Sequence, residues 1–116
     1  MTLEEFYEAV GGDLAEVRAR LAKDERILKY LNKFVDSTDY DELVTALGES
    51  RYEDAFRFVH NLKGVAANLG LGSLFEVSHV LCEELRGGAP QNDVTDMLNA
   101  VTEKNQEAKE AIKQLQ

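Results

Sequence analysis

The sequence predicts an all-α fold, an antiparallel up-and-down four-helix bundle with short N-terminal helices packed across it. Three observations support this prediction. Apolar residues recur at intervals of three and four along most of the 116-residue chain, as on one face of a helix. No run of residues alternates between apolar and polar as a half-buried strand does. Glycines and polar stretches separate the helical segments by connections of about two to eight residues, and short connections favour antiparallel neighbours.

The N-terminal segment predicts two short helices. Thr2 and Glu5 have the spacing of a capping box, so they begin a helix that ends at Gly11 and Gly12. Asp13 is a suitable cap for a second helix. The apolar residues of the second helix fall on one face, and they are Leu14, Val17 and Leu21. We expect these first twenty residues to pack across the bundle.

Two more helices are predicted before residue 50. The segment 25–35 carries apolar residues at helical spacing, namely Ile27, Leu28, Leu31, Phe34 and Val35. After the polar sequence DSTD, a shorter helix is expected over 40–47, and it ends at Gly48.

The middle of the chain predicts a pair of longer helices. The first covers about 51–69 and meets a C-terminal glycine at Gly70, whereas the second covers about 73–86 and ends before Gly87. Both begin at capping-box patterns, which are Ser50 with Glu53 and Ser73 with Glu76.

The C-terminal segment predicts the last long helix. It follows the least helical stretch of the chain, RGGAPQND, and carries a long stripe of period 3.6, formed by Val94, Met97, Leu98, Val101, Ala108, Ile112 and Leu115. We expect the four arms of the bundle to be roughly 24–36, 51–69, 73–86 and 92–115, and residues 1–116 to form a single domain.

Composition narrows the classes of function. Apolar residues make up 44% and charged residues 30%, as in an ordinary globular protein. The formal net charge of −9 argues against nucleic acid and membrane surfaces as partners. The single Cys82 cannot form an intrachain disulfide, and the N-terminus has no signal-peptide pattern. We therefore expect a cytoplasmic protein, and a monomer, because no sustained heptad seam is present.

One face of the 51–69 helix combines unusual residues. On a helical wheel Ala55, Val59, Leu62, Ala66 and Leu69 share the core sector, and His60 lies roughly 150° from its middle. Phe56, Lys63, Gly64 and Ala67 surround His60 at the spacings that bring helical residues into contact. We therefore expect His60 to face solvent, between a cation, a glycine and two apolar residues.

This combination suits a phosphoryl carrier. Neutral imidazole, the main form of an exposed histidine at pH 7, is a nucleophile that forms covalent intermediates. Lys63 places an ammonium group within one turn, where it favours a phosphoryl group and hinders a metal cation. Gly64 costs about 1 kcal/mol of helix stability relative to alanine, but it leaves open space beside the ring. Phe56 and Ala67 are apolar on a solvent-facing side, which indicates a docking surface.

The stretch HNLKGVAANLG resembles the signature of histidine-containing phosphotransfer domains, whose core is H-x-x-K-G followed by an apolar residue and glycine. The matching positions are His60, Lys63, Gly64, Leu69 and Gly70. The likeness continues through GLGSLFEVSHVLCEELRGG and covers about residues 50–88, while the flanks match only in helical character and length. The resemblance implies an antiparallel four-helix bundle that exchanges a phosphoryl group with an aspartate of response-regulator receiver domains.

Carried over by residue, the resemblance implies that His60 is the phospho-acceptor, Lys63 the phosphate-facing cation and Gly64 the steric clearance. Family members often carry a glutamine in the next helix, facing the histidine, and Cys82 occupies the corresponding place here. The expected partners are a receiver domain and an upstream hybrid histidine kinase. The residues expected to contact a partner are Phe56, Arg57, Ala67, Asn68 and Cys82.

Other interpretations remain open at this stage. The chain has no phosphate-binding loop, so we expect a phosphocarrier and not an enzyme that phosphorylates itself from ATP, and we expect no cofactor and no metal. The phosphotransfer domain of a chemotaxis-type histidine kinase would carry a similar motif. A helical adaptor of the same fold without phosphate chemistry is a second alternative. His60, His79 and Cys82 could be imagined as ligands of a metal- or redox-active bundle, but no ligand spacing supports this. His79 lies beside an apolar stripe, so we expect a structural role for it.

Overall fold

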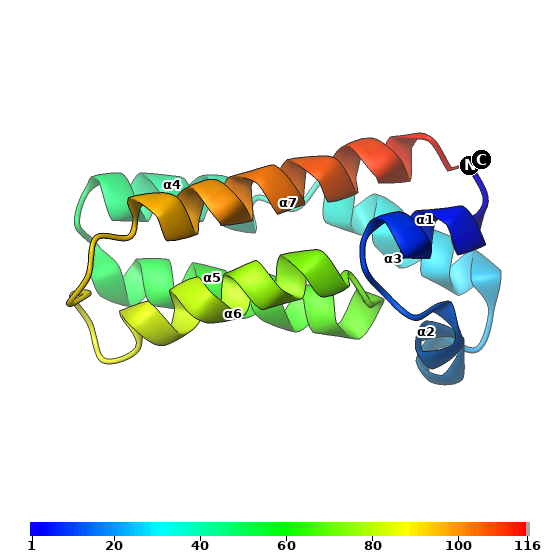
Figure 1. Cartoon of the computed structure of the whole chain (residues 1–116), viewed down its shortest axis with the longest axis horizontal. Helices are drawn as coiled ribbons and strands as arrows, with labels where there is room; N and C mark the ends of the chain where they lie inside the picture. Colours follow the sequence, from blue (N-terminus) through cyan, green and yellow to red (C-terminus); the bar gives the residue numbers. More distant parts are fainter. Residues whose placement is uncertain (116) are drawn as a thin grey trace.

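The computed structural model describes residues 1–115. It contains seven helices in this range and no strand, which confirms the all-α prediction (Figure 1). Their bounds are α1 (Leu3–Ala9), α2 (Leu14–Leu21), α3 (Asp24–Val35), α4 (Asp39–Gly48), α5 (Tyr52–Leu69), α6 (Gly72–Leu85) and α7 (Thr95–Lys113).

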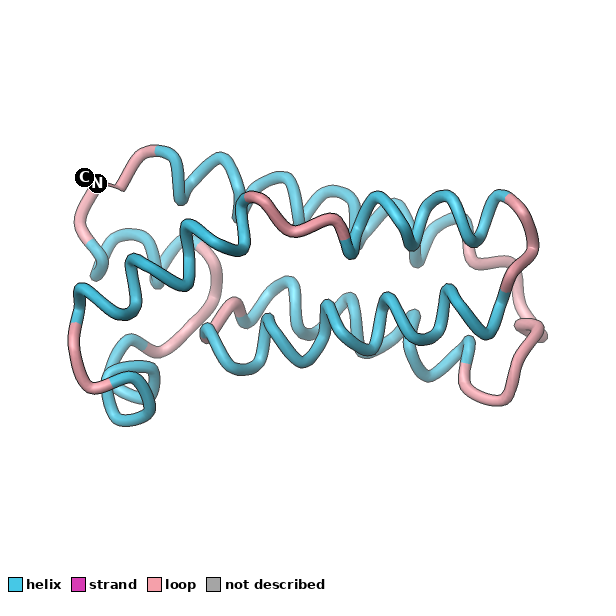
Figure 2. The backbone as a smooth tube through the Cα atoms, turned by 180° about the vertical axis from the view of Figure 1, so that it is seen from behind, coloured by secondary structure: helices cyan, strands magenta, loops and turns pink. Residues whose placement is uncertain are grey.

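The bundle is built from α5, α6, α7 and a fourth arm that two helices share. The most extensive contacts join α5 to α6, α4 to α5 and α6 to α7, so successive arms are neighbours, as expected of an up-and-down bundle. Helices α3 and α4 follow one another along the length of the bundle and are separated by a short loop (Figure 2). The four-helix bundle is therefore confirmed.

The expected composition of the first arm was incomplete. We expected 24–36 to form it alone, but α3 contributes one half and α4 the other. The loop between them contains Ser37, whose hydroxyl accepts a hydrogen bond from the backbone N–H of Asp39 at 3.3 Å. Such local side-chain bonds compete with the helix ladder and stop it. The ammonium group of Lys109 in α7 donates a hydrogen bond to the carbonyl of Ser37 at 3.2 Å, so α7 also stabilises the loop between α3 and α4.

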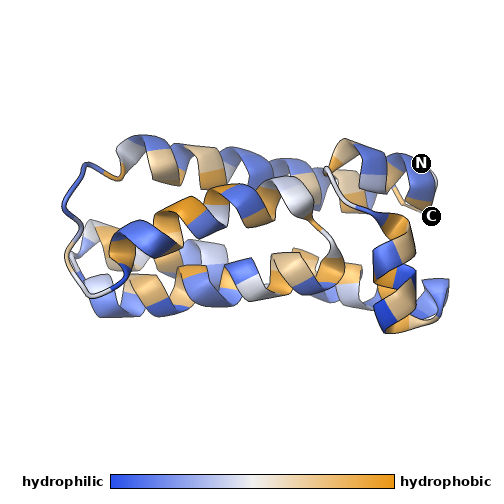
Figure 3. Ribbon diagram, turned by 60° about the horizontal axis from the view of Figure 1, so that its bottom comes forward, coloured by the Kyte–Doolittle hydropathy of each residue, from blue (hydrophilic) through white to orange (hydrophobic). Residues whose placement is uncertain are grey.

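Hydrophobic side chains along the helices form one buried core. Hydrophobic and hydrophilic residues alternate in patches along each helix, as on an amphipathic surface (Figure 3). The largest fully buried side chains are Tyr7, Phe6, Ile27, Leu31, Leu43, Leu62, Leu71, Leu74, Leu81, Leu85, Val17 and Val59. This core includes both short N-terminal helices, so they are an integral part of the packing.

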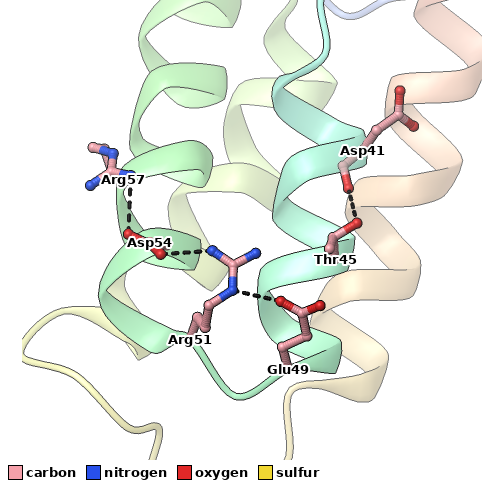
Figure 4. Close-up of polar contacts among 6 residues, drawn as sticks. All are labelled: Asp41, Thr45, Glu49, Arg51, Asp54 and Arg57. Carbon is pink, nitrogen blue, oxygen red and sulfur yellow. Dashed lines mark hydrogen bonds and ion pairs between the residues drawn. The ribbon is translucent and has the colours of Figure 1, made fainter.

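The N-terminal caps agree with the sequence pattern, whereas two other capping-box predictions were wrong. Thr2 and Glu5 form the expected capping box, and Asp13 accepts hydrogen bonds from the first turn of α2. In contrast, α5 and α6 have no side-chain cap. At the start of α5, Arg51 instead pairs with Glu49 and Asp54 at 2.7 Å each (Figure 4).

The start of α6 is held by a tertiary contact. The helix begins at Gly72, so Ser73, which was expected to cap it, lies inside the helix. The backbone N–H of Ser73 donates a hydrogen bond to the carbonyl of Val10 at 2.9 Å. The loop between α1 and α2 therefore packs directly against the turn between α5 and α6. Gly70 ends α5 with φ 72°, in the left-handed region that favours glycine, as predicted.

Tyr7 links α1 to the end of α5. Its hydroxyl is buried and donates to the carbonyl of Leu69 at 2.8 Å, which satisfies one of the carbonyls that every helix end leaves without an intrahelical partner. Burial raises the pKa of Tyr7 to about 12, and the charge of Arg20 opposes this rise only in part.

Stability should therefore fall in alkali because of Tyr7. An unfolded tyrosine ionises near pH 10, whereas the folded protein keeps Tyr7 protonated up to about pH 12. The stabilisation from Tyr7 is complete below pH 10 and is lost as the pH rises from 10 to 12. Urea unfolding across this range should show a steeper fall in the free energy of unfolding for the wild type than for Tyr7→Phe. Parallel curves for the two proteins would contradict the assignment.

Candidate functional site

His60 lies on the exposed side of α5, as its position on the wheel predicts. Its side chain is exposed, and the residues expected in the core sector are all buried, namely Ala55, Val59, Leu62, Ala66 and Leu69. The eighteen-residue helix α5 packs against α4 on one side and α6 on the other. The imidazole is therefore carried by a well-supported helix and points away from the core.

Phe56 and Arg86 support the imidazole on the side of α6. The rings of Phe56 and His60 lie 5.8 Å apart between centroids with a 45° tilt. The guanidinium of Arg86, at the end of α6, lies 5.2 Å from the centroid of the Phe56 ring. It also donates two hydrogen bonds to Glu83 at 3.1 and 3.2 Å. Sequence reasoning missed Arg86, which directly follows Leu85, the last residue of α6, and has extended backbone, so helical spacing does not place it.

Lys63 is half-buried and lies close to the same part of α6. Arg86, through its side-chain hydrogen bonds, holds the pKa of Glu83 below its ordinary value, and the charge of Lys63 acts in the same direction. The charge of Lys63 therefore reaches the part of α6 that carries Cys82 and Glu83, and its role toward a phosphoryl group on His60 stays a prediction.

Cys82 does not belong to the docking surface. It is fully buried in the core, so the prediction that it contacts a partner was wrong. Burial raises the pKa of its thiol, while the charges of Lys63 and Arg86 act in the opposite direction. The apolar residues between α5 and α6 enclose this position because it faces the bundle and not the solvent. A buried thiol of this kind behaves as a small apolar side chain.

Gly64 provides open space beside His60. A Cβ atom built at this position would meet no other atom within 4 Å, so packing inside the protein does not require a glycine there. The residue is also exposed and has no positive φ. Neither packing nor backbone conformation accounts for this glycine, and the space that it leaves is open to an external group.

A hollow of about 790 Å³ opens on the other side of His60. Its walls come from α2, α4 and α5, and the lining residues are Arg20, Asp39, His60, Asn61, Gly64, Val65, Ala67 and Asn68. Two residues of the expected contact surface, Ala67 and Asn68, therefore share a hollow with His60. Phe56 and Arg57 lie outside it, and Arg57 is paired with Asp54 at 3.0 Å (Figure 4).

Arg20 reaches this hollow from α2, and sequence reasoning missed it. Its guanidinium donates to the carbonyl of Ala67 at 3.1 Å and to that of Asn68 at 3.1 and 3.3 Å. These carbonyls belong to the last turn of α5, where cations are favourable. No local pattern in the sequence indicates this contact, because 47 and 48 residues separate the partners.

His79 has different surroundings. Its ring stacks on Phe75 with centroids 6.0 Å apart and a 10° angle between the planes, and its Nδ1 lies 4.0 Å from a carboxylate oxygen of Glu83.

Within residues 1–115, no three or more His, Cys, Asp or Glu side chains form a group that could hold a metal ion. In the same range, no helix combines the length and the apolar character needed to cross a membrane.

Comparisons with known proteins identify the family. Searches of curated proteins and of solved structures found no match. The family model described as "Hpt domain" matches residues 2–116, which is essentially the whole chain. The helical bundle and the exposed histidine on α5 agree with this match. The chain therefore belongs to the Hpt domain family, whose members have a phosphotransfer role in phosphorelay signalling.

Proposed function

We propose that His60 accepts a phosphoryl group from the aspartate of a response-regulator receiver domain and donates it back in the reverse reaction. The observation that carries the proposal is the exposed imidazole of His60 on α5. Gly64 leaves open space beside this imidazole, and the chain belongs to the Hpt domain family. Hpt domains generally interact with receiver domains, and an upstream hybrid histidine kinase would supply the phosphoryl group to the relay.

The reaction requires little chemistry from this chain. A lone pair on a neutral ring nitrogen of His60 attacks the phosphorus of the aspartyl phosphate in line. The nitrogen–phosphorus bond forms as the bond from phosphorus to the aspartate oxygen breaks, and the aspartate leaves as a carboxylate. Phosphoryl transfer depends mainly on positioning and charge stabilisation. Lys63, on the same side of the helix, would attract the phosphoryl oxygens, and the receiver would supply the remaining electrostatic stabilisation.

The contact surface follows from the open space around His60. Ala67 and Asn68 line the hollow beside the imidazole, whereas Phe56 borders the ring on the opposite side. Arg57 is exposed nearby, and its guanidinium is paired with Asp54 at 3.0 Å. A modest interface of this kind suits a partner that must bind and leave during transfer.

A panel of phosphorylated receiver domains tests the proposal directly. Each receiver carries labelled phosphate and is mixed with the purified protein, and phosphoramidate serves as a small donor that needs no docking. We expect acid-labile, alkali-stable label on the protein from at least one receiver and from phosphoramidate. ATP alone should give none. Absence of label with every receiver and with phosphoramidate would reject the phosphocarrier and leave an adaptor of the same fold.

Replacing Gly64 with alanine should separate stability from transfer. The helix should gain about 1 kcal/mol, because alanine is the better helix former and the new methyl group meets nothing within 4 Å. Transfer from a receiver should slow by about tenfold, because the methyl group fills the approach to His60. The measurements are urea unfolding and the initial rate of transfer.

Gly48→Ala is the matched control for this variant. Gly48 ends α4, lies outside the hollow and also has nothing within 4 Å of its Cβ position. We expect it to raise stability slightly and to leave the transfer rate unchanged. Unchanged transfer in Gly64→Ala as well would show that the glycine does not provide clearance for the partner.

A further inference from the structure

Arg20 holds a fixed positive charge in the hollow of His60. Three hydrogen bonds join its Nε and Nη2 to the carbonyls of Ala67 and Asn68. They orient the guanidinium without neutralising it, because carbonyl oxygens carry no net charge. The Nη1 group has no hydrogen-bond partner among residues 1–115. The side chain is exposed, so this end of the fork is open to a ligand.

Arg18 on the same helix has different surroundings. Arg18 pairs with Asp24 at 2.9 Å and lies 3.9 Å from Glu4, so its charge is already matched within the chain. No carboxylate lies within 4.0 Å of Arg20 in the described part of the chain. In a protein with a net charge of −9, an arginine that is positioned but not matched by an acid is available for an anionic partner.

The position of Arg20 also links two hollows. A second hollow of about 340 Å³ lies between the loop after α1 and the start of α6. Its lining includes Arg20, Ala67 and Phe75, together with the acidic residues Asp13, Glu16 and Glu76. Arg20 and Ala67 belong to both hollows, so the two lie side by side on one surface. A partner that fills both while reaching His60 has to pass over the guanidinium of Arg20.

We propose that Arg20 is a docking residue that binds the acidic, phosphate-bearing site of the receiver domain and so contributes to the choice of partner. This inference rests on the proposed function of His60. Guanidinium groups bind carboxylate and phosphate oxygens through paired N–H donors, and the pre-oriented fork of Arg20 loses little side-chain entropy on binding. Asp39, the other charged side chain of the hollow, should oppose the same partner by charge repulsion.

Opposite substitutions of these two charges test the inference. A receiver that transfers to the wild type serves as the donor, and KM for the phosphorylated receiver is measured at low and at high salt. Arg20→Gln should raise KM by about five- to tenfold at low salt and should weaken the dependence of KM on salt, with kcat close to that of the wild type. Arg20→Lys should recover part of the loss. Asp39→Asn should lower KM.

Two controls separate docking from a structural role. Arg18→Gln removes the same charge from α2 and should leave KM unchanged. Phosphoramidate, which needs no docking surface, should label His60 at the same rate in Arg20→Gln and in the wild type. Unchanged KM together with a lower Tm in Arg20→Gln would overturn the proposal, because Arg20 would then only cap α5.

Labelling of the wild type separates failure of the Arg20 docking proposal from failure of the proposed phosphoryl transfer at His60. Slower labelling of Arg20→Gln by phosphoramidate would also overturn docking, because Arg20 would then act at His60 itself. If the wild type accepts label from neither donor, the proposed function fails, and the role of Arg20 fails with it. If the wild type is labelled but Asp39→Asn and Arg20→Gln change KM in the same direction, only the docking proposal fails.

Discussion

Replacement of His60 with glutamine is expected to abolish phosphorylation by every donor while leaving the fold intact. Glutamine keeps a polar side chain of similar length, but its amide nitrogen has no available lone pair to attack phosphorus. The side chain is exposed and glutamine is a good helix former, so α5 should remain folded. The measurements are the incorporation of acid-labile label from receivers and from phosphoramidate, and thermal unfolding followed by circular dichroism.

His79→Gln is the matched control for this experiment. It removes the other histidine of the chain, which is also exposed and also lies beside a phenylalanine. We expect normal labelling in His79→Gln and none in His60→Gln. Label that persists without His60 would reject the assignment, and label that disappears without His79 would move the acceptor to α6.

The sequence predicted most of the fold because the signals for it are local. Apolar spacing and glycine positions located all seven helices, and Gly70 ends α5 in the conformation that its position predicted. The capping boxes at Ser50 and Ser73 were wrong for a different reason. The residue pattern is present at both places, but ion pairs of Arg51 and the contact between Ser73 and Val10 decide the backbone there. Tertiary contacts override a four-residue pattern of this kind.

The site was predictable only where it lies on a single helix. The wheel places His60, Gly64 and Ala67 on the exposed side of α5, and the structure agrees. Arg20 and Asp39 come from other helices, so their position beside His60 depends on how α2 and α4 pack. The burial of Cys82 depends in the same way on the orientation of α6. The resemblance to a family indicated the place of this residue in the sequence but not its exposure.

The loop between α1 and α2 crosses the turn between α5 and α6 in a close backbone-to-backbone contact, and this junction holds α2 against the bundle. A Cβ atom on Gly72 would overlap the carbonyl oxygen of Gly11 and lie 2.9 Å from its carbonyl carbon. A Cβ atom on Gly12 would likewise overlap the carbonyl oxygen of Gly70. Neither backbone can move without displacing a helix end.

Gly72→Ala is therefore expected to lower the free energy of unfolding by about 2–3 kcal/mol, as overpacking in a close contact does. Gly72 has no positive φ, so the loss would come from the overlap and not from backbone strain. Urea unfolding compares the same substitution at a tightly packed position, Gly72→Ala, and at an open position, Gly64→Ala. The free energy of unfolding should fall in the first variant and rise in the second. Because the junction also positions α2, a displaced loop in Gly72→Ala should weaken transfer from a receiver more than labelling by phosphoramidate. Equal stability of Gly72→Ala and the wild type would show that the two loops are not in close contact in solution.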